Sequence, residues 1–171
     1  MLTIAPTFDG KRTIPSEAVT QVMCQLLDLK EGEKLMEIGT GSGFQTGYWA
    51  GFGVEVHSIE LEPWIDSTQV IGECVYLHTR DGRKGLPEHA PFDAIVATCG
   101  VEQLPQEWIE QLKPGGRLVV PLGDASCQKL TLFRKQNGEL IPERIGAYTR
   151  FQMMRDMPKP KAPKYNPKDH D

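Results

Sequence analysis

The chain has 171 residues, of which 39% are hydrophobic and 25% are charged, and its formal net charge is −4. This length fits a single domain with one hydrophobic core, and the composition is that of an ordinary globular protein. No apolar run approaches the ~20 residues of a membrane span, and the N-terminus lacks the basic and apolar pattern of a signal peptide. We therefore expect a cytoplasmic protein with no membrane partner.

Charge is distributed unevenly along the chain. Residues 155–171 contain five Lys or Arg and three Asp, so the first 154 residues carry about −6 and the tail about +2. A net-acidic body argues against nucleic acid as the main partner. The tail is rich in Lys and Pro and has little to bury, which predicts a disordered segment. We expect one domain over residues 1–154, with an irregular segment at 1–12.

The predicted elements alternate between strands and helices. Apolar residues at helical spacing predict a helix over 15–27, and shorter helices are predicted at 44–52 and 105–112. The apolar runs predict strands at 34–38, 54–60, 73–78, 92–98 and 117–122. A tight turn at 113–116 precedes the last of them. Residues 129–135 and 139–145, joined by Gln136-Asn137-Gly138, have the pattern of an Asn-Gly hairpin.

This order predicts an α/β fold. Five strands in βα alternation, followed by a hairpin, indicate an open, mostly parallel seven-stranded sheet with helices on both faces, a Rossmann-like arrangement. In such sheets the ligand lies beyond the carboxyl ends of the strands, where the strand order reverses. Glu60, Asp81, Thr98 and Cys99 fall at those ends. One site is expected to collect them.

The glycine-rich turn after the first strand carries the strongest functional signal. Gly39, Gly41 and Gly43 stand at alternate positions, where the missing Cβ lets the backbone turn sharply and approach a ligand. No register gives the dinucleotide fingerprint G-x-G-x-x-G, which disfavours a nicotinamide oxidoreductase. Glu37, two residues before the first glycine, would repel a pyrophosphate but attract the amino group of an amino-acid moiety. The pattern resembles motif I of the class I methyltransferases, which bind S-adenosylmethionine.

Cysteine and histidine positions give no sign of a metal site. The four cysteines lie far apart without a Cys-x-x-Cys pair, which indicates reduced thiols and no zinc site in a cytosolic protein. His57 lies in the middle of a predicted strand and His89 in a loop between prolines. We expect His57 to be a packed or surface histidine and His89 to be a structural member of its motif, and neither to act as a base.

Several motifs together resemble the protein-L-isoaspartate (D-aspartate) O-methyltransferase family over about residues 13–145. They are Leu29-Lys30-x-Gly32-Glu33-Lys34, Glu37-Ile38-Gly39-Thr40-Gly41-Ser42-Gly43-Phe44-Gln45, Ser58-Ile59-Glu60, Asp81-Gly82, Pro87-Glu88-His89-Ala90-Pro91-Phe92-Asp93 and Leu112-Lys113-Pro114-Gly115-Gly116. The Pro-Glu-His-Ala-Pro-Phe-Asp run and Gln45 point to this family in particular.

The resemblance implies S-adenosylmethionine as methyl donor, S-adenosylhomocysteine as product, and a protein or peptide substrate with an aspartyl or isoaspartyl residue. It places Glu37 and the glycine loop on the methionine part of the cofactor, Glu60 on the ribose hydroxyls and Asp81-Gly82 against the adenine. The residues expected to bind the cofactor are Glu37, Gly39, Thr40, Gly41, Ser42, Gly43, Gln45, Glu60, Leu61, Asp81, Gly82 and Thr98.

The segment that would face the substrate departs from the family pattern. The family has Gln-Thr-Ile-Ser, then one residue and Pro, whereas this chain has Arg12-Thr13-Ile14-Pro15-Ser16-Glu17. Ser16 and Thr13 are the candidate catalytic residues, because either hydroxyl could orient the acceptor carboxylate. Alternatively, Ser16 only caps or lines the start of the following helix. An ionised carboxylate acceptor needs no general base.

We therefore predict a carboxyl O-methyltransferase of the isoaspartyl type, active in protein repair. Two alternatives remain open: a divergent member that methylates another dedicated acceptor, and a non-catalytic protein that binds the cofactor or a partner.

Overall fold

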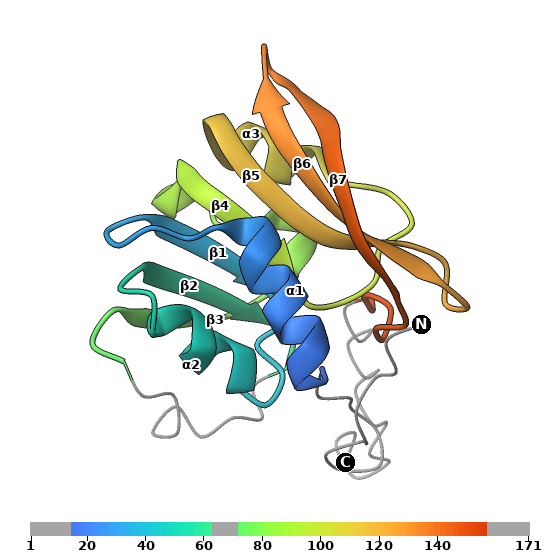
Figure 1. Ribbon diagram of the computed structural model, residues 1–171. Coiled ribbons are helices and arrows are strands. Elements are labelled where there is room, and N and C mark those ends of the chain that lie inside the picture. The colour runs from blue at the N-terminus through green and yellow to red at the C-terminus, as the bar shows by residue number, and fades with distance from the viewer. Residues whose placement is uncertain (1–14, 63–71, 157–171) are drawn as a thin grey trace, which may run out of the picture.

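The computed structural model describes residues 15–62 and 72–156 and is shown in Figure 1. The strands are β1 (Lys34–Ile38), β2 (Glu55–Glu60), β3 (Val75–Thr79), β4 (Phe92–Ala97), β5 (Leu112–Gly123), β6 (Gln128–Gln136) and β7 (Glu139–Thr149). The α-helices are α1 (Glu17–Leu27), α2 (Phe44–Ala50) and α3 (Gln106–Gln111), and two 3-10 turns are η1 (Gly82–Lys84) and η2 (Pro87–His89). Among the described helices none has the length and apolar character needed to cross a membrane. Thr13, the segment 1–12, the connection 63–70 and the tail from residue 157 onward lie outside the described residues.

The strands form one seven-stranded sheet in the order β3-β2-β1-β4-β5-β6-β7. Strands β1 to β5 pair in parallel, and β6 and β7 add an antiparallel hairpin at one edge. The predicted fold class is thereby confirmed. The chain runs outward from β1 to β3 and then returns to β4 on the other side of β1, so the strand order reverses between β1 and β4. A ligand crevice is expected at the carboxyl ends of these two strands.

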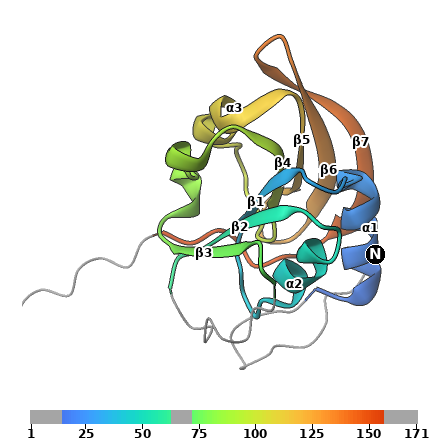
Figure 2. The same ribbon diagram turned by 90° about the vertical axis from the view of Figure 1, so that its left-hand side faces the viewer.

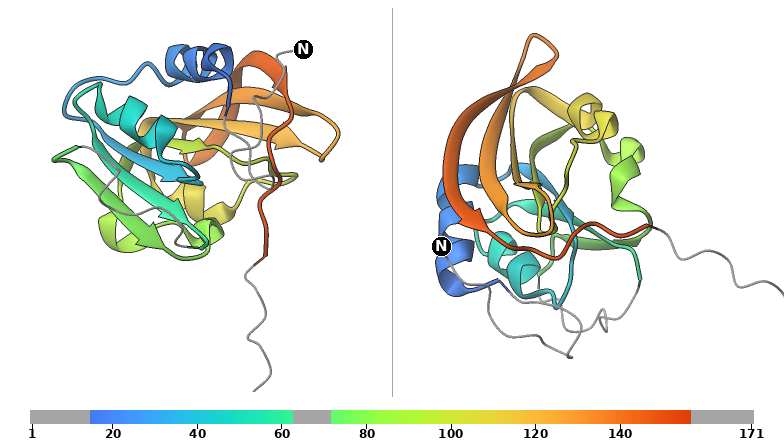
Figure 3. Two further views of the ribbon diagram at one scale, coloured as in Figure 1. Left: turned by 90° about the horizontal axis from the view of Figure 1, so that it is seen from below. Right: turned by 90° about the vertical axis from the view of Figure 1, so that its right-hand side faces the viewer.

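Helices cover both faces of the sheet, as predicted, and Figures 2 and 3 show the two layers. Strand residues alternate between the faces, so neighbours in β1 enter different cores. Leu35 packs with Met23 of α1 and Trp49 of α2, whereas Met36 packs on the other face with Trp108 of α3. The sheet is therefore held between two separate apolar cores, one on each face.

At the end of the sheet the strands β5 and β7 are longer than predicted, and the predicted hairpin turn is confirmed. Strand β5 begins at Leu112, so the predicted turn at 113–116 lies inside it as a bulge. Phe92 pairs with Leu112 and Ala94 with Arg117, which leaves four residues of β5 opposite one residue of β4. The hairpin turns through Asn137 (φ 51°) and Gly138 (φ 82°), the left-handed pair that a type I′ turn requires.

Candidate functional site

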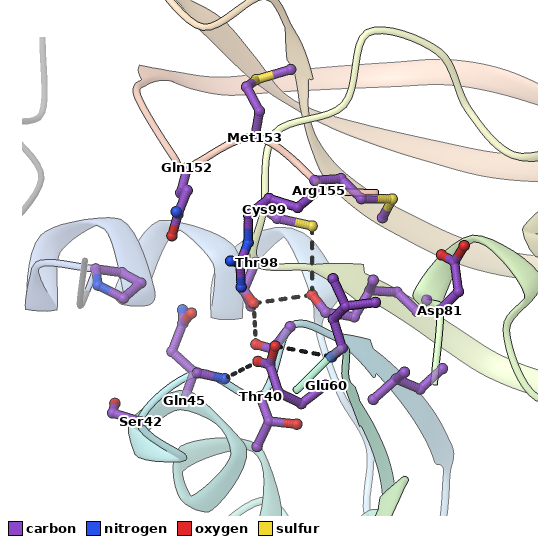
Figure 4. A pocket seen from close by; sticks show the side chains of 18 of the residues that line it. Thr40, Ser42, Gln45, Glu60, Asp81, Thr98, Cys99, Gln152, Met153 and Arg155 are labelled. Carbon is purple, nitrogen blue, oxygen red and sulfur yellow. Dashed lines mark hydrogen bonds between the residues drawn. The ribbon is translucent and has the colours of Figure 1, made fainter. Parts of the chain in front are cut away.

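A pocket opens at the carboxyl edge of the sheet, where the strand order reverses (Figure 4). Its walls come from the loop after β1, the ends of β2 and β4, the start of η1, and a C-terminal segment at 152–155. Ten of the twelve residues expected to bind the cofactor line it, namely Gly39, Thr40, Gly41, Ser42, Gln45, Glu60, Leu61, Asp81, Gly82 and Thr98. The structure thus brings together residues that are up to 59 positions apart in the sequence.

The glycine loop needs its glycines for backbone shape. Gly39, Gly41 and Gly43 have φ values of +99°, +53° and +77°, a region that residues with a Cβ rarely adopt. The amides of Gly39 and Thr40 donate to the carbonyl of Ile59 at 2.8 and 3.2 Å. These bonds fasten the loop to the end of β2 and hold its backbone against the pocket.

Glu60 places a carboxylate beside this loop. Gly41 N–H donates to Oε2 at 2.9 Å, and Leu61 N–H donates to Oε1 at 3.0 Å. Each carboxylate oxygen has further lone pairs, and the side chain lines the pocket. Glu60 therefore keeps the capacity to accept protons from the hydroxyls of a ligand.

Asp81 and Gly82, at the start of η1 after β3, form another wall of the pocket. Asp81 caps η1, accepting from Arg83 N–H at 3.0 Å and from the Arg83 guanidinium at 3.2 Å. A Cβ on Gly82 would come within 2.6 Å of Ile38 Cγ2, and its carbonyl accepts from Trp108 Nε1 at 2.8 Å. The missing side chain lets Gly82 pack closely against Ile38 at the end of β1, beside the pocket.

Thr98 and Cys99, at the end of β4, form part of the floor. Thr98 Oγ1 donates to the carbonyl of Ile38 at 3.0 Å and also bonds the carbonyl of Gly39. Burial raises the pKa of the Cys99 thiol to about 12. The thiol stays protonated near neutral pH, so it is a poor nucleophile.

Glu37 and Gly43 lie outside the pocket lining. Glu37 is fully buried behind the loop, where Oε2 accepts from Thr46 Oγ1 at 2.5 Å and Ser58 Oγ at 2.6 Å, and Oε1 accepts from Trp49 Nε1 at 2.8 Å. In the structure Glu37 therefore supports the loop from beneath and does not line the pocket. Gly43 forms the N-cap of α2.

The burial of Glu37 predicts a pH effect on stability. Burial raises its pKa from 4.5 to about 7, against the hydrogen bonds from Ser58, Thr46 and Trp49. The folded state therefore holds this proton more tightly than the unfolded state, so the stabilisation is complete below about pH 4.5 and is lost as the pH rises towards 7. We expect the free energy of unfolding of Glu37→Gln, relative to the wild type, to increase between these pH values. Urea unfolding of both proteins over this range measures it, and a difference independent of pH would contradict the account.

Of the segment expected to face the substrate, the structure describes Pro15, Ser16 and Glu17. Pro15 lines the pocket, whereas Ser16 does not. Ser16 is the N-cap of α1, and its Oγ accepts from Val19 N–H at 3.3 Å. The structure thus shows the capping alternative for Ser16.

Substitution of Ser16 separates capping from catalysis. Ser16→Ala removes the cap and is expected to lower the free energy of unfolding by about 1 kcal/mol, with methyl-transfer turnover unchanged. Denaturant unfolding and initial rates measure the two effects. A loss of turnover at full stability would instead place the hydroxyl in the reaction.

The C-terminal segment is the part of the site that sequence reasoning missed. Gln152, Met153, Met154 and Arg155 line the pocket, and Met153 pairs with Gly100 through a parallel bridge. Arg155, which the sequence assigned to the tail, belongs to this wall. No local pattern in the sequence predicts that this segment lines the pocket, because its backbone pairing is with Gly100 in the loop after β4.

A buried glutamine anchors this segment. Gln128 is fully buried, and its Oε1 accepts from Phe151 N–H at 2.6 Å. Arg83 adds an ion pair to Asp156 at 2.8 Å.

Comparison with known proteins is consistent with this geometry. The model of the family described as protein-L-isoaspartate(D-aspartate) O-methyltransferase matches residues 3–155. A protein-L-isoaspartate O-methyltransferase of Christiangramia forsetii is 38% identical over 152 residues, covering 85% of this chain and 71% of that protein. One of Opitutus terrae is 42% identical over 151 residues, covering 81% and 65%. This chain is therefore markedly shorter than these relatives.

Solved structures share the fold. A protein-L-isoaspartate O-methyltransferase superposes with a TM-score of 0.79 at 27% identity, over 91% of this chain and 53% of that one. A Plasmodium falciparum structure described as a β-aspartate methyltransferase in complex with S-adenosyl-L-homocysteine gives a TM-score of 0.71 at 20% identity, over 91% and 81%. Because the second structure is only 20% identical to this chain, the comparison with it supports a shared fold and nothing more.

Proposed function

The chain belongs to the protein-L-isoaspartate (D-aspartate) O-methyltransferase family, and we propose that it transfers a methyl group from S-adenosylmethionine to an isoaspartyl carboxylate of a protein or peptide. The observation that carries the proposal is the pocket at the reversal of strand order, where the glycine loop, Glu60 and Asp81 meet. Action on damaged cytoplasmic proteins is part of the proposal.

The residues of the pocket fit this cofactor by the chemistry of their groups. Glu60 has acceptor capacity for ribose hydroxyls in charge-assisted hydrogen bonds. Asp81, beside Gly82 in the pocket wall, is an acceptor for an exocyclic amine. The backbone of Gly39 to Gly41 faces the methionine part, where no Cβ stands in the way.

The reaction needs positioning more than acid–base catalysis. When bound, S-adenosylmethionine supplies a methyl group on a positively charged sulfur. An oxygen of the acceptor carboxylate forms the new bond to the methyl carbon while the carbon–sulfur bond breaks, and its electron pair stays on sulfur. The carboxylate is already ionised at neutral pH, so the protein contributes alignment and the exclusion of water.

Two parts of the pocket wall are placed to provide that alignment. Met153 and Met154 offer apolar, polarizable surface over the site. Among the described residues that line the pocket, Arg155 alone carries a positive charge, and a guanidinium binds a carboxylate through two donors. We assign Arg155 to attraction of the acceptor.

The cofactor assignment is tested by calorimetry. S-adenosylhomocysteine is expected to bind with one site per chain, while NAD⁺ gives no heat above dilution. Binding of NAD⁺ without binding of S-adenosylhomocysteine would overturn the assignment and restore the oxidoreductase alternative.

A second candidate function rests on Pro15. This proline lines the pocket in the place where the family pattern has a hydroxyl, and Ser16 is engaged as a helix cap. The cofactor half of the site is thus retained while the acceptor half is altered. This favours, as the runner-up, a divergent member that methylates another dedicated acceptor or binds the cofactor without transfer.

A further inference from the structure

Three histidines come together on the sheet face opposite α1 and α2. His57 lies in β2, His78 in β3, and His89 ends η2. One ring nitrogen from each lies within 4.8 Å of the others, and none of the three lines the pocket. This cluster has no part in the proposed methyl transfer.

The hydrogen bonds of His57 direct a lone pair into the cluster. His57 Nε2 lies 2.7 Å from Glu55 Oε1, and since a carboxylate accepts, Nε2 carries the proton. The other nitrogen, Nδ1, is then unprotonated and lies 3.1 Å from His78 Nε2. A carboxylate that fixes the tautomer in this way is the usual companion of a metal-binding histidine.

The spacing of the nitrogens suits a tetrahedral ion. Zinc binds imidazole nitrogen at about 2.0–2.1 Å, which puts two nitrogens of a tetrahedral site roughly 3.3 Å apart. The observed distance of 3.1 Å between His57 Nδ1 and His78 Nε2 is close to this nitrogen–nitrogen separation. His89 approaches from a separate element, its ring centroid 4.4 Å from that of His57 and 5.1 Å from that of His78.

An aromatic ring of β3 packs against the cluster. His57 stacks on Tyr76, with ring centroids 4.9 Å apart.

Charged neighbours balance one another. Lys34 Nζ donates to the carbonyl of His89 at 3.1 Å and lies 4.0 Å from Glu55 Oε1, so its positive charge faces the carboxylate. Arg80 and Glu88 form an ion pair at 2.7 Å that ties β3 to η2. Neither pair places an uncompensated positive charge at the three nitrogens.

We propose that His57, His78 and His89 bind a divalent transition-metal ion of the zinc type, with Glu55 orienting His57. His78 and His89 are half-buried, which leaves a route for the ion and room for water as a fourth ligand. Through these three ligands the ion links η2 to β2 and β3 at the edge of the sheet. These two strands lead to Glu60 and Asp81. The site escapes cysteine-based reasoning, because its ligands come from three elements spread over 33 residues.

The alternative occupant of the gap between His57 and His78 is a proton shared in an ordinary hydrogen bond. Calorimetric titration of untagged, chelator-treated protein with Zn²⁺ decides between them. We expect one ion per chain. Glu55→Gln is expected to weaken binding by about 10–100-fold, and His78→Gln and His89→Gln by more than that.

Matched controls keep this test specific. His170→Gln removes the fourth histidine of the sequence, and Cys74→Ser removes an exposed thiol. Both variants should bind zinc as the wild type does. Zinc should also raise the temperature of unfolding of the wild type and of both controls, and should not raise that of His78→Gln. Absence of binding at millimolar zinc, or binding that survives the loss of both His78 and His89, would overturn the proposal.

Discussion

Glu60→Ala is expected to weaken the binding of S-adenosylhomocysteine by about 10²–10⁴-fold. Two hydrogen bonds from ribose hydroxyls to a charged acceptor are each worth about 1.5–3 kcal/mol, which together give about 3–6 kcal/mol. The variant also removes the acceptor of Gly41 N–H, so the loop loses a support. Calorimetric titration of the purified variant measures the loss.

The controls separate ligand binding from folding. Glu60→Gln keeps the size of the side chain but loses its charge, and it should fall between the wild type and Glu60→Ala. Glu107→Ala removes an exposed carboxylate on α3, outside the pocket, and should bind normally. Unchanged affinity in Glu60→Ala would refute the assignment of Glu60 to the cofactor.

Gly41→Val should abolish cofactor binding altogether. At φ +53° a residue with a Cβ is strained by roughly 1–2 kcal/mol, and Gly41 lines the pocket. No protein atom lies within 4 Å of where the Cβ would stand, so the valine can fit the protein only by occupying space at the ligand. Calorimetry should show no binding, with the protein still folded by circular dichroism.

Gly138→Val provides a matched control for this substitution. Gly138 also has a positive φ, +82°, and also has open space around its would-be Cβ, but it lies in the β6–β7 turn. Both variants should lose similar stability, while Gly138→Val keeps the full affinity for S-adenosylhomocysteine. Equal binding by the two variants would mean that Gly41 does not face the cofactor.

The sheet was predictable because its signals are local. Apolar runs mark the central strands, and the Asn137-Gly138 pair specifies the hairpin turn through its left-handed backbone. Glu60, Asp81 and Thr98 follow from the same reasoning, since the ends of parallel strands meet at one edge. The identity of the cofactor came from the family resemblance, because the spacing of the glycines and carboxylates alone does not specify it.

The parts that escaped prediction depend on contacts between distant residues. Glu37 reads in sequence as a ligand-facing carboxylate, but its partners Thr46, Trp49 and Ser58 come from α2 and β2 and turn it into a buried brace. The segment at 152–155 reaches the pocket because Gln128 anchors it. Neither the contacts of Glu37 nor those of Gln128 can be predicted from the periodicity of the sequence.

The central claim is methyl transfer to an isoaspartyl carboxylate, and one assay tests it most directly. Purified protein is incubated with radiolabelled S-adenosylmethionine and two peptides that differ only in an isoaspartyl or a normal aspartyl linkage, and base-labile methyl groups are counted. The account predicts label on the isoaspartyl peptide alone. No label on either peptide, with S-adenosylhomocysteine still bound by calorimetry, would contradict it and favour a dedicated acceptor or a non-catalytic role.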